Sequence, residues 1–551
     1  MSREYHDGSS VPVVIAGAGP VGVSAAILLA QRGIETLIVE RWDDIYPLPR
    51  AVHIDDEIYR VLQDMGVAEE FAKITEPTLG LRLIDAKQRT MAEFRRNDPI
   101  GPHGYPPANM FDQPELERVL RHRLATLRRA TLASGTELVD VERDPSGDHL
   151  RVRLRDVHTG QESIVRTRAL LGGDGANSTV RDIVGATLED LGFEERWLVA
   201  DVRSVRPLPI WQGVHQLCDP RRAGTLMRVG PERYRWEFRL HDGESPDDLL
   251  CSGTLADLVQ PWLGNVRFEE LELLKYAEYT FKARIADRWR DGRIFLLGDA
   301  AHLTPPFIGQ GLCAGLRDAA NLTWKLAAVL SGHADEQLLD SYEPERKPHA
   351  RALVKKAVTV GWVMTGGQDA AAHVRRVALA VACRIPGATD QVLDSKPPRL
   401  SDGLAVRRNG RRDRVTGGQL PQPFVTVPGA RVRLVEATGA DHSVLVVGEP
   451  NPRLVAAAKQ AGATVIRLVG PGTQPSEHPS YQVAVDDDGH LLQWFRRNRT
   501  AAVLVRPDHV VQAHEREHAQ HSPGAQLADY LTSWTREMSW TGAVHTTAGG
   551  R

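Results

Sequence analysis

The stretch GAGPVG near the N-terminus has glycines at the spacing of a dinucleotide-binding turn. Gly17 permits a tight turn, Gly19 lets a pyrophosphate approach the backbone, and Gly22 lets a helix pack closely on the preceding strand. Glu40, which ends the next apolar run, stands where a carboxylate can accept hydrogen bonds from both hydroxyls of an adenosine ribose. The glycines and the carboxylate together predict a dinucleotide site.

Three elements must position these residues. A β-branched run over 13–16 predicts a strand, residues 23–31 predict a helix that Gly33 ends, and the run TLIVE predicts a second strand ending at Glu40. The bare amides at the start of such a helix attract an anion. A membrane-spanning helix is the alternative for this uncharged stretch, but its glycines and proline interrupt the run and argue against it.

Two later segments also place aspartate beside glycine near the end of a predicted strand. Asp174–Gly175 precede a short helix capped by Asn177 or Ser178, and Gly298–Asp299 precede the proline-rich loop 304–311 and a helix over 312–330. The start of the second helix presents bare amides, which suit the N1–C2=O edge of a reduced isoalloxazine, where negative charge accumulates. Taken alone, each segment also fits an ordinary connector between a strand and a helix.

The composition limits the partners of the chain. Its 551 residues are 42% apolar and 25% charged, and the net charge of -3 gives no reason to expect a nucleic acid. The basic run at 407–414 is interpreted as a solvated loop. Four widely separated cysteines form no CxxC pair, which argues against a metal site or a disulfide framework and favours the cytoplasm. The first residues lack the cationic region of a signal peptide.

With its three motifs in order, the sequence resembles the single-component FAD-dependent aromatic hydroxylases of the p-hydroxybenzoate hydroxylase type. The resemblance extends over roughly residues 10–385 and is greatest to the 3-(3-hydroxyphenyl)propionate hydroxylase branch. It includes the strings LPRAVHIDDE, QPELERVL, LGFEERWLVADV, CDPRR and YTFKARIADRWRDGR. Because the chain has one complete dinucleotide fingerprint, we expect the nicotinamide donor to bind transiently in a groove rather than in a domain of its own.

The resemblance implies which residues bind FAD. Glu40 would hold the adenosine ribose and Asp299 the ribityl or ribose-phosphate portion, while Asp174 is associated with both FAD and the nicotinamide donor. The full set of expected FAD contacts is Gly17, Gly19, Pro20, Gly22, Glu40, Arg41, Arg50, Gln113, Asp174, Gly175, Gly298, Asp299, Pro306, Gly309, Gly311 and Leu312.

The resemblance also implies hydroxylation of a phenolic substrate, such as a 3-hydroxyphenylpropanoid acid, with NADH or NADPH and O2 through a flavin C4a-hydroperoxide. The protein must then exclude water and favour the phenolate. The candidate catalytic residues are His53 and His302, because imidazole titrates near neutrality, and Pro306 in the apolar loop 303–307. Each histidine has an alternative, His53 as a packed polar residue and His302 as the cap of its turn.

Four residues are candidates for contact with the substrate, namely Tyr279, Phe281, Phe307 and His215. Tyr279 and Phe281 alternate on a predicted strand, for which an ordinary core strand is the default interpretation, and a core or surface role is the default for His215. A carboxylate on the substrate would call for an arginine or lysine, and the sequence does not select one among its many arginines.

The predicted fold class is α/β, with a Rossmann-like FAD-binding domain, an inserted and largely antiparallel substrate-binding sheet, and a C-terminal thioredoxin-like α/β domain. The FAD-binding domain is expected over 1–395, in segments of about 1–80, 105–190 and 280–395, with the inserted domain in about 80–105 and 190–280. A linker at 396–404, the thioredoxin-like domain at 405–540 and a tail at 541–551 complete the chain. Because the C-terminal domain lacks CxxC, we expect it to support a homodimer or to be purely structural.

Other functions fit the same motifs. One is Baeyer–Villiger oxygen insertion into, or epoxidation of, a polyketide-like aromatic, which product identification separates from phenol hydroxylation. Another is a non-catalytic FAD-binding protein, against which phenol-stimulated oxidation of NAD(P)H would argue. A membrane-associated flavin hydroxylase is disfavoured, because the sequence shows no basic amphipathic or C-terminal apolar anchor.

Overall fold

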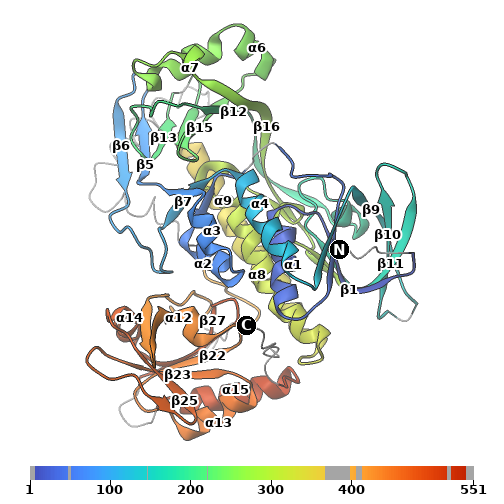
Figure 1. The fold of residues 1–551 in the computed structure, drawn as a ribbon, viewed down its shortest axis with the longest axis vertical. Helices are drawn as coiled ribbons and strands as arrows, with labels where there is room; N and C mark the ends of the chain where they lie inside the picture. Colours follow the sequence, from blue (N-terminus) through green and yellow to red (C-terminus); the bar gives the residue numbers. More distant parts are fainter. Residues whose placement is uncertain are drawn as a thin grey trace.

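The computed structural model describes residues 7–47, 51–145, 147–219, 221–365, 397–404, 413–517 and 523–541. In these ranges the chain forms three eight-stranded sheets and a small three-stranded one (Figure 1). The predicted fold class is confirmed: a Rossmann-like sheet, a largely antiparallel second sheet and a separate C-terminal α/β domain. The predicted tail, from residue 542 onward, and the stretch 366–396 lie outside the described residues.

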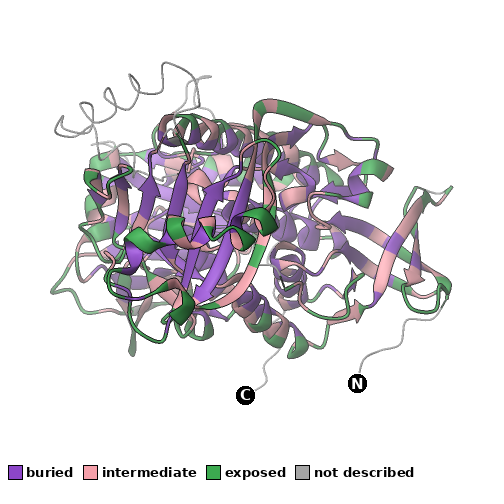
Figure 2. Ribbon diagram, turned by 90° about the horizontal axis from the view of Figure 1, so that it is seen from above, coloured by how far each residue is buried: buried purple, intermediate pink, exposed green. Residues whose placement is uncertain are grey.

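The first sheet has a parallel core in the order β18-β11-β1-β2-β8. Its strands are β1 (Ser10–Ala16), β2 (Thr36–Glu40), β8 (Ala130–Ser134), β9 (Thr136–Arg143), β10 (Leu150–Asp156), β11 (Glu162–Gly172), β17 (Arg290–Asp291) and β18 (Ile294–Leu296). Helices α1 (Pro20–Gln31) and α4 (Gln113–Ala125) pack on its strands, and α8 (Gly311–Leu330) packs against α1. Because helices cover its faces, β1 and β2 are almost continuously apolar and buried, as Figure 2 shows in purple for the cores of the sheets.

Two boundaries differ from those predicted from sequence. Helix α1 begins at Pro20 rather than at residue 23, because the fixed backbone angle of proline suits a first helical turn. Strand β18 ends at Leu296, and Gly298–Ala300 form a 3-10 turn that carries Asp299. The φ of Gly298 is 58°, a conformation that ends an extended strand.

The second sheet has the order β19-β16-β12-β15-β14-β13-β5-β6 and is antiparallel except where β13 meets β5. Its strands are β5 (Gly80–Ile84), β6 (Thr90–Arg95), β12 (Leu188–Arg203), β13 (Val214–Leu217), β14 (Gly224–Arg228), β15 (Arg233–Arg239), β16 (Glu272–Ala286) and β19 (His302–Leu303). Helices α6 (Pro246–Cys251) and α7 (Thr254–Leu263) lie over one end of it (Figure 1). A small sheet has the order β3-β7-β4 and consists of β3 (His53–Asp55), β7 (Ala108–Phe111) and β4 (Thr75–Pro77). Helices α2 (Asp56–Asp64) and α3 (Ala68–Ala72) lie between β3 and β4 in the chain.

The C-terminal domain packs against α8 and against α9 (Tyr342–Thr365), the two helices that follow the third motif. Its strands are β20 (Phe424–Val427), β21 (Ala430–Arg433), β22 (Ser443–Val447), β23 (Thr464–Val469), β24 (Glu477–His478), β25 (Tyr481–Val485), β26 (Thr500–Val505) and β27 (Val511–Arg516). Its helices are α12 (Leu434–Thr438), α13 (Pro452–Gln460), α14 (His490–Asn498) and α15 (Ala525–Glu537).

A buried charge network joins this domain to the rest of the chain. Glu345 on α9 accepts hydrogen bonds from Arg506 at 2.7 Å and from Lys325 at 2.8 Å, and all three side chains are fully buried. Breaking such a buried pair on one side leaves an uncompensated charge, so the network fixes the C-terminal domain against α8 and α9.

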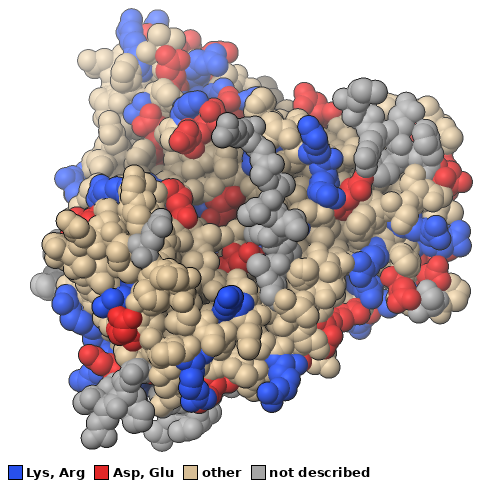
Figure 3. Space-filling model, turned by 60° about the horizontal axis from the view of Figure 1, so that its bottom comes forward, with Lys and Arg blue, Asp and Glu red and all other residues tan. Residues whose placement is uncertain are grey.

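On the face drawn in Figure 3, basic and acidic side chains are interspersed rather than gathered by sign. Among the described residues, no helix combines the length and the apolar character that crossing a bilayer requires.

Candidate active site

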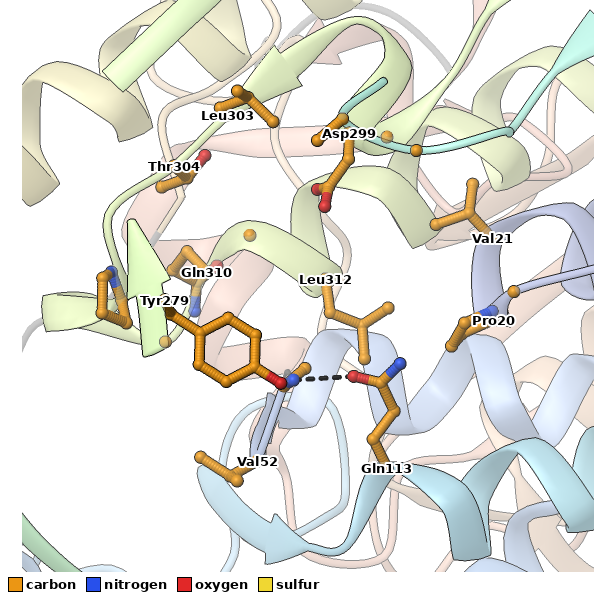
Figure 4. Close-up of a pocket in the computed structure, with 18 of the residues that line it drawn as sticks. Pro20, Val21, Val52, Gln113, Tyr279, Asp299, Leu303, Thr304, Gln310 and Leu312 are labelled. Atoms are coloured by element: carbon orange, nitrogen blue, oxygen red, sulfur yellow. Dashed lines mark hydrogen bonds between the residues drawn. The ribbon is translucent and has the colours of Figure 1, made fainter. Parts of the chain in front are cut away.

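A cavity of about 950 Å³ is lined by residues of all three glycine–carboxylate motifs and by one face of the second sheet. This volume is at the upper end of the range for ligand pockets. Most of the FAD contacts predicted from sequence line it: Gly17, Gly19, Pro20, Glu40, Arg41, Gln113, Asp174, Gly175, Gly298, Asp299, Pro306, Gly309, Gly311 and Leu312. Figure 4 shows side chains from several separate segments, among them Asp299, Leu312, Gln113 and Tyr279, converging on it.

The three motifs meet because backbone hydrogen bonds tie their turns together. The amide of Gly17 donates to the carbonyl of Val39, the amide of Gly173 to that of Ala16, and the amide of Leu297 to that of Gly172, each at 2.9 Å. The turns after β1, β11 and β18 therefore form one continuous edge at the carboxyl ends of parallel strands, where α/β sheets bind ligands.

Two glycines of the first motif, Gly17 and Gly22, lie too close to neighbouring backbone atoms to carry a side chain. Gly17 has a φ of 93°, and a Cβ there would lie 2.5 Å from the carbonyl oxygen of Gly173. A Cβ on Gly22 would lie 2.0 Å from the carbonyl oxygen of Gly17, so Gly22 packs α1 on the turn and does not line the cavity. At Gly19 nothing lies within 4 Å of the Cβ position. This glycine leaves space on the cavity side.

Carboxylates fix the edges of the cavity. Glu40 accepts hydrogen bonds from the amides of Ala18 at 2.8 Å and Trp42 at 3.1 Å, so it joins the end of β2 to the glycine turn. Asp174 accepts from Ser178 Oγ at 2.5 Å and from the amide of Val180 at 3.1 Å, at the start of α5 (Thr179–Ile183). Burial raises the pKa of Asp174 above its ordinary value.

Helix α8 begins at the cavity with free amides. Its N-cap residue, Gln310, does not cap the helix, because its side chain donates to Asp55 at 3.1 Å and accepts from Arg317 at 3.0 Å. Arg317 also forms a buried pair with Asp55 and Glu57, and this pairing holds the pKa of Asp55 low although burial alone would raise it.

These features fit a dinucleotide cofactor. The amides that begin α1 and α8 face the cavity without a side-chain cap, the Gly19 position leaves room for a phosphate, and carboxylates border both helix starts. Gln113, the first residue of α4, holds Ala51 in place. Its Oε1 accepts a hydrogen bond from the amide of Ala51 at 2.7 Å (Figure 4). Arg50, also predicted as a contact, lies outside the described residues.

His53 lines the cavity but is not the near-neutral proton relay expected from sequence. Its Nδ1 lies 3.1 Å from the carbonyl oxygen of Gly309, an arrangement in which the imidazole donates. Burial, together with the positive charge of Arg96, lowers the pKa of His53 to about 4. The ring is therefore neutral at physiological pH.

His302 is placed outside the cavity, contrary to its prediction as a catalytic residue. It is completely buried, its Nε2 lies 2.9 Å from Asp318 Oδ2, and its ring stacks on Trp289. Asp318 also accepts the amide of Gly298 at 3.1 Å. His302 is therefore linked to the turn of the third motif through Asp318, and its side chain does not reach the cavity.

The predicted aromatic contacts line the second part of the cavity. Tyr279 and Phe281 point to the same side of β16 with stacked rings, and Phe307 packs edge-on against Trp197. Gly361 on α9 makes room for Phe307, because a Cβ there would lie 2.3 Å from its ring.

His215 does not line the cavity, contrary to its prediction as a substrate contact. Its neighbours Val214 and Gln216 do, so the alternation of the strand turns His215 to the opposite face. There its Nε2 lies 3.0 Å from the carbonyl oxygen of Trp211.

Comparisons with known proteins agree with this geometry. Residues 10–357 match the FAD binding domain family, and residues 417–529 match the HcaD C-terminal domain. The chain is 33% identical over 516 residues, 93% of each chain, to the "Probable NADH-specific resorcinol 4-hydroxylase" of Rhodococcus jostii strain RHA1. It is 34% identical over 518 residues, 91% of this chain and 93% of the relative, to the "3-(3-hydroxy-phenyl)propionate/3-hydroxycinnamic acid hydroxylase" of Burkholderia cenocepacia strain HI2424.

The chain belongs to the FAD-dependent aromatic hydroxylases. Solved structures share its fold. Aklavinone-11 hydroxylase, in a ternary complex with FAD and aklavinone, is 25% identical with a TM-score of 0.75 and covers 97% of this chain and 100% of its own. The flavin-dependent monooxygenase PieE, 21% identical, has a TM-score of 0.79 over 96% of this chain and 100% of its own.

In this hydroxylase, a row of polar side chains on the second sheet was not predicted from the sequence. Gln216, Thr225 and Glu237 lie side by side on β13, β14 and β15, and all three line the cavity. Thr225 donates to Gln216 at 3.1 Å. The signal was available in RYRWEFR, where charged residues alternate with aromatic ones, but alternation alone does not say which face borders a cavity.

Glu237 is the titratable member of this row. It is 6% exposed, and the nearby buried pair of Arg235 and Asp201, at 2.6 Å, is the charged neighbour that acts on it. Burial raises the pKa of Glu237 to about 7, while Arg235 lowers it and Asp201 raises it further. Glu237 therefore changes charge near neutrality.

The raised pKa of Glu237 should make the stability of the protein depend on pH, and replacing Glu237 should remove this dependence. Because the pKa is about 7 in the folded state and about 4.5 when unfolded, the native state binds more protons between these values, and stability falls as pH rises through that window. We expect Glu237→Gln to equal the wild type near pH 4.5 and to exceed it at pH 8 by about 1–3 kcal/mol in the free energy of unfolding, measured by urea denaturation.

The matched control is Glu278→Gln on β16. Its hydrogen bonds from Arg196 lower the pKa of Glu278, so this variant should not gain stability at pH 8. Equal stability of Glu237→Gln and wild type at pH 8 would contradict a raised pKa for Glu237.

Proposed function

We propose that the protein is an FAD-dependent monooxygenase that hydroxylates a phenolic substrate with NADH or NADPH and O2. One observation carries the proposal: the cavity that contains the three FAD motifs continues along the aromatic and polar face of the second sheet. A flavin ring and an aromatic substrate can therefore share one chamber. The hydroxylase names of the relatives that match over most of the chain support the same reaction.

The residues at the parallel edge would hold the cofactor. We assign the amides at the start of α1 to the pyrophosphate, Glu40 to the adenosine ribose, and the start of α8 to the isoalloxazine edge. FAD, once bound and reduced by NAD(P)H, supplies the activation of O2 that hydroxylation requires.

The chain itself would exclude water and manage the phenolic proton. Leu303, Pro306 and Phe307 form an apolar wall beside the start of α8, which keeps water from the reacting ring. Glu237, with a pKa of about 7, is suited to accept the phenolic proton at its carboxylate. His53, neutral and tied to Gly309, would position the loop rather than exchange protons.

The relatives' names point to small phenols substituted at the position meta to the hydroxyl. Resorcinol carries a second hydroxyl there, and 3-(3-hydroxyphenyl)propionate carries a carboxylate side chain. We propose this class as the substrate and NADH as the donor. A homodimer and a cytoplasmic location stay predictions from the sequence.

The first test measures coupling between phenol and NADH. We expect 3-(3-hydroxyphenyl)propionate or resorcinol to accelerate NADH oxidation by the FAD-loaded protein by about 10-fold or more, since substrate binding completes the dry chamber. Mass spectrometry should show a product one oxygen atom heavier, with a new ring hydroxyl. NADH loss that no phenol accelerates would contradict the proposal, and a lactone or epoxide would redirect it to another oxygenation.

A second test probes the pyrophosphate position. The φ of Gly19 is -71°, so alanine fits the backbone, but its methyl group would enter the space assigned to the phosphate. We expect Gly19→Ala to fold, as judged by circular dichroism of the apoprotein, and to bind FAD about 10- to 100-fold more weakly by fluorescence titration. Gly230→Ala, in the turn between β14 and β15, is the control and should bind FAD normally; equal affinity for both variants would refute the assignment.

A third test addresses proton acceptance. With Glu237 as the base, kcat/KM should rise with pH through about 7, as its carboxyl ionises. In Glu237→Gln this rise should vanish and kcat should fall about 100-fold. Survival of the same pH profile in the variant would show that another group accepts the proton.

A further inference from the structure

The cations that line the cavity from β15 and β16 are already paired with carboxylates of the protein. Arg235 is paired with Asp201, and Lys282 and Arg284 lie 3.4 and 3.2 Å from carboxylate oxygens of Glu194. These groups have protein partners and are poorly placed to attract a further anion.

Arg96 is different. It follows β6 at the edge of the second sheet, lines the cavity and is only partly exposed. Within the described ranges of the chain, its guanidinium makes no hydrogen bond and has no carboxylate within salt-bridge distance. The carboxylate that acts on it electrostatically, Asp56, directs Oδ2 to the amide and Nδ1 of His103, both at 3.0 Å.

A backbone hydrogen bond fixes the main chain at Arg96 and therefore the position of its Cα beside the cavity. The amide of Arg96 donates to the carbonyl of Leu79 at 2.9 Å, and residues 78, 80 and 81 of the same segment line the cavity. None of the three FAD motifs lies on this edge of the second sheet. A partly buried guanidinium without a partner costs free energy unless an anion joins it.

The neighbouring groups do not compensate its charge. His53 is close enough for Arg96 to lower its pKa, and the ring is neutral. Burial also lowers the pKa of Arg96 below its ordinary value, because the attraction of Asp56 does not offset the loss of hydration.

We propose that Arg96 binds the carboxylate of the substrate, so that the preferred substrates are phenolic acids rather than neutral phenols. This inference rests on the proposed function and selects between the two kinds of phenol that the relatives' names offer. A guanidinium binds a carboxylate through two parallel hydrogen bonds, which fixes both the position and the direction of the side chain of the acid. Arg96 thereby orients the ring and acts as a specificity-determining residue.

The experiment compares two ligands of the same shape. Dissociation constants are measured for 3-(3-hydroxyphenyl)propionate and for the uncharged 3-(3-hydroxyphenyl)propan-1-ol on the FAD-loaded protein, by calorimetry in the absence of NADH. We expect the wild type to bind the acid more tightly than the alcohol. Arg96→Gln should weaken binding of the acid about 10- to 100-fold relative to the alcohol, and Arg96→Lys should retain part of the preference.

The control is the adjacent residue, which is the last one of β6. Arg95 is exposed and paired with Glu93, so Arg95→Gln should leave the ratio of the two dissociation constants unchanged. FAD content is measured for every variant by absorbance. A parallel loss of affinity for acid and alcohol in Arg96→Gln, an unchanged ratio, or loss of FAD would each overturn the assignment, as would failure of both ligands to bind the wild type.

Failure of this inference can be told apart from failure of the proposed function. If both phenols accelerate NADH oxidation but Arg96→Gln keeps the wild-type ratio, the function stands and Arg96 is not the anchor. If the ratio changes as expected while neither phenol accelerates NADH oxidation, the anchor stands and the hydroxylase proposal falls.

Discussion

The site depends on the adjacency of three strand ends in one parallel sheet. Strands β1, β11 and β18 pair in register, so the turns that follow them lie next to one another although they are distant in the chain. The approach is so close that a side chain at Gly17 would collide with the backbone of Gly173. The groups that we assign to FAD lie at this edge, at the end of the neighbouring strand β2, or at the starts of α1 and α8.

Around this edge, networks of buried polar side chains hold neighbouring elements together. Arg317 joins Asp55, Glu57 and Gln310, so the small sheet, α2 and the start of α8 share one network. Asp318 similarly ties His302 and Arg346 to the turn at Gly298. Because the side chain of Gln310 is held in the first of these networks, it does not cap α8, and the amides that begin this helix face the cavity.

The sequence allowed the cofactor half of the site to be predicted because its constraints are local. Glycine spacing, strand composition and a terminal carboxylate are readable in one segment, and they placed Gly17, Gly19 and Glu40 at the cavity. The substrate half depends on sheet pairing between distant strands. Nothing local shows that Glu237 faces the cavity, that His215 faces away, or that His302 is sealed behind Asp318.

The same distinction explains why the pKa of His53 differs from the one expected from its residue type. A histidine near the flavin motif is a reasonable base when only its intrinsic pKa is known. Burial and a nearby arginine lower the pKa of His53, whereas burial raises that of Glu237, so Glu237 and not His53 changes charge near neutrality. Such shifts follow from three-dimensional surroundings and not from residue type.

The most direct measurement is a crystal structure of the protein grown with FAD. We expect the pyrophosphate to lie against the amides that begin α1, the adenosine ribose at Glu40, and the isoalloxazine at the start of α8, facing the second sheet. FAD bound at any other place, or a saturated crystal in which this edge holds no cofactor, would contradict it.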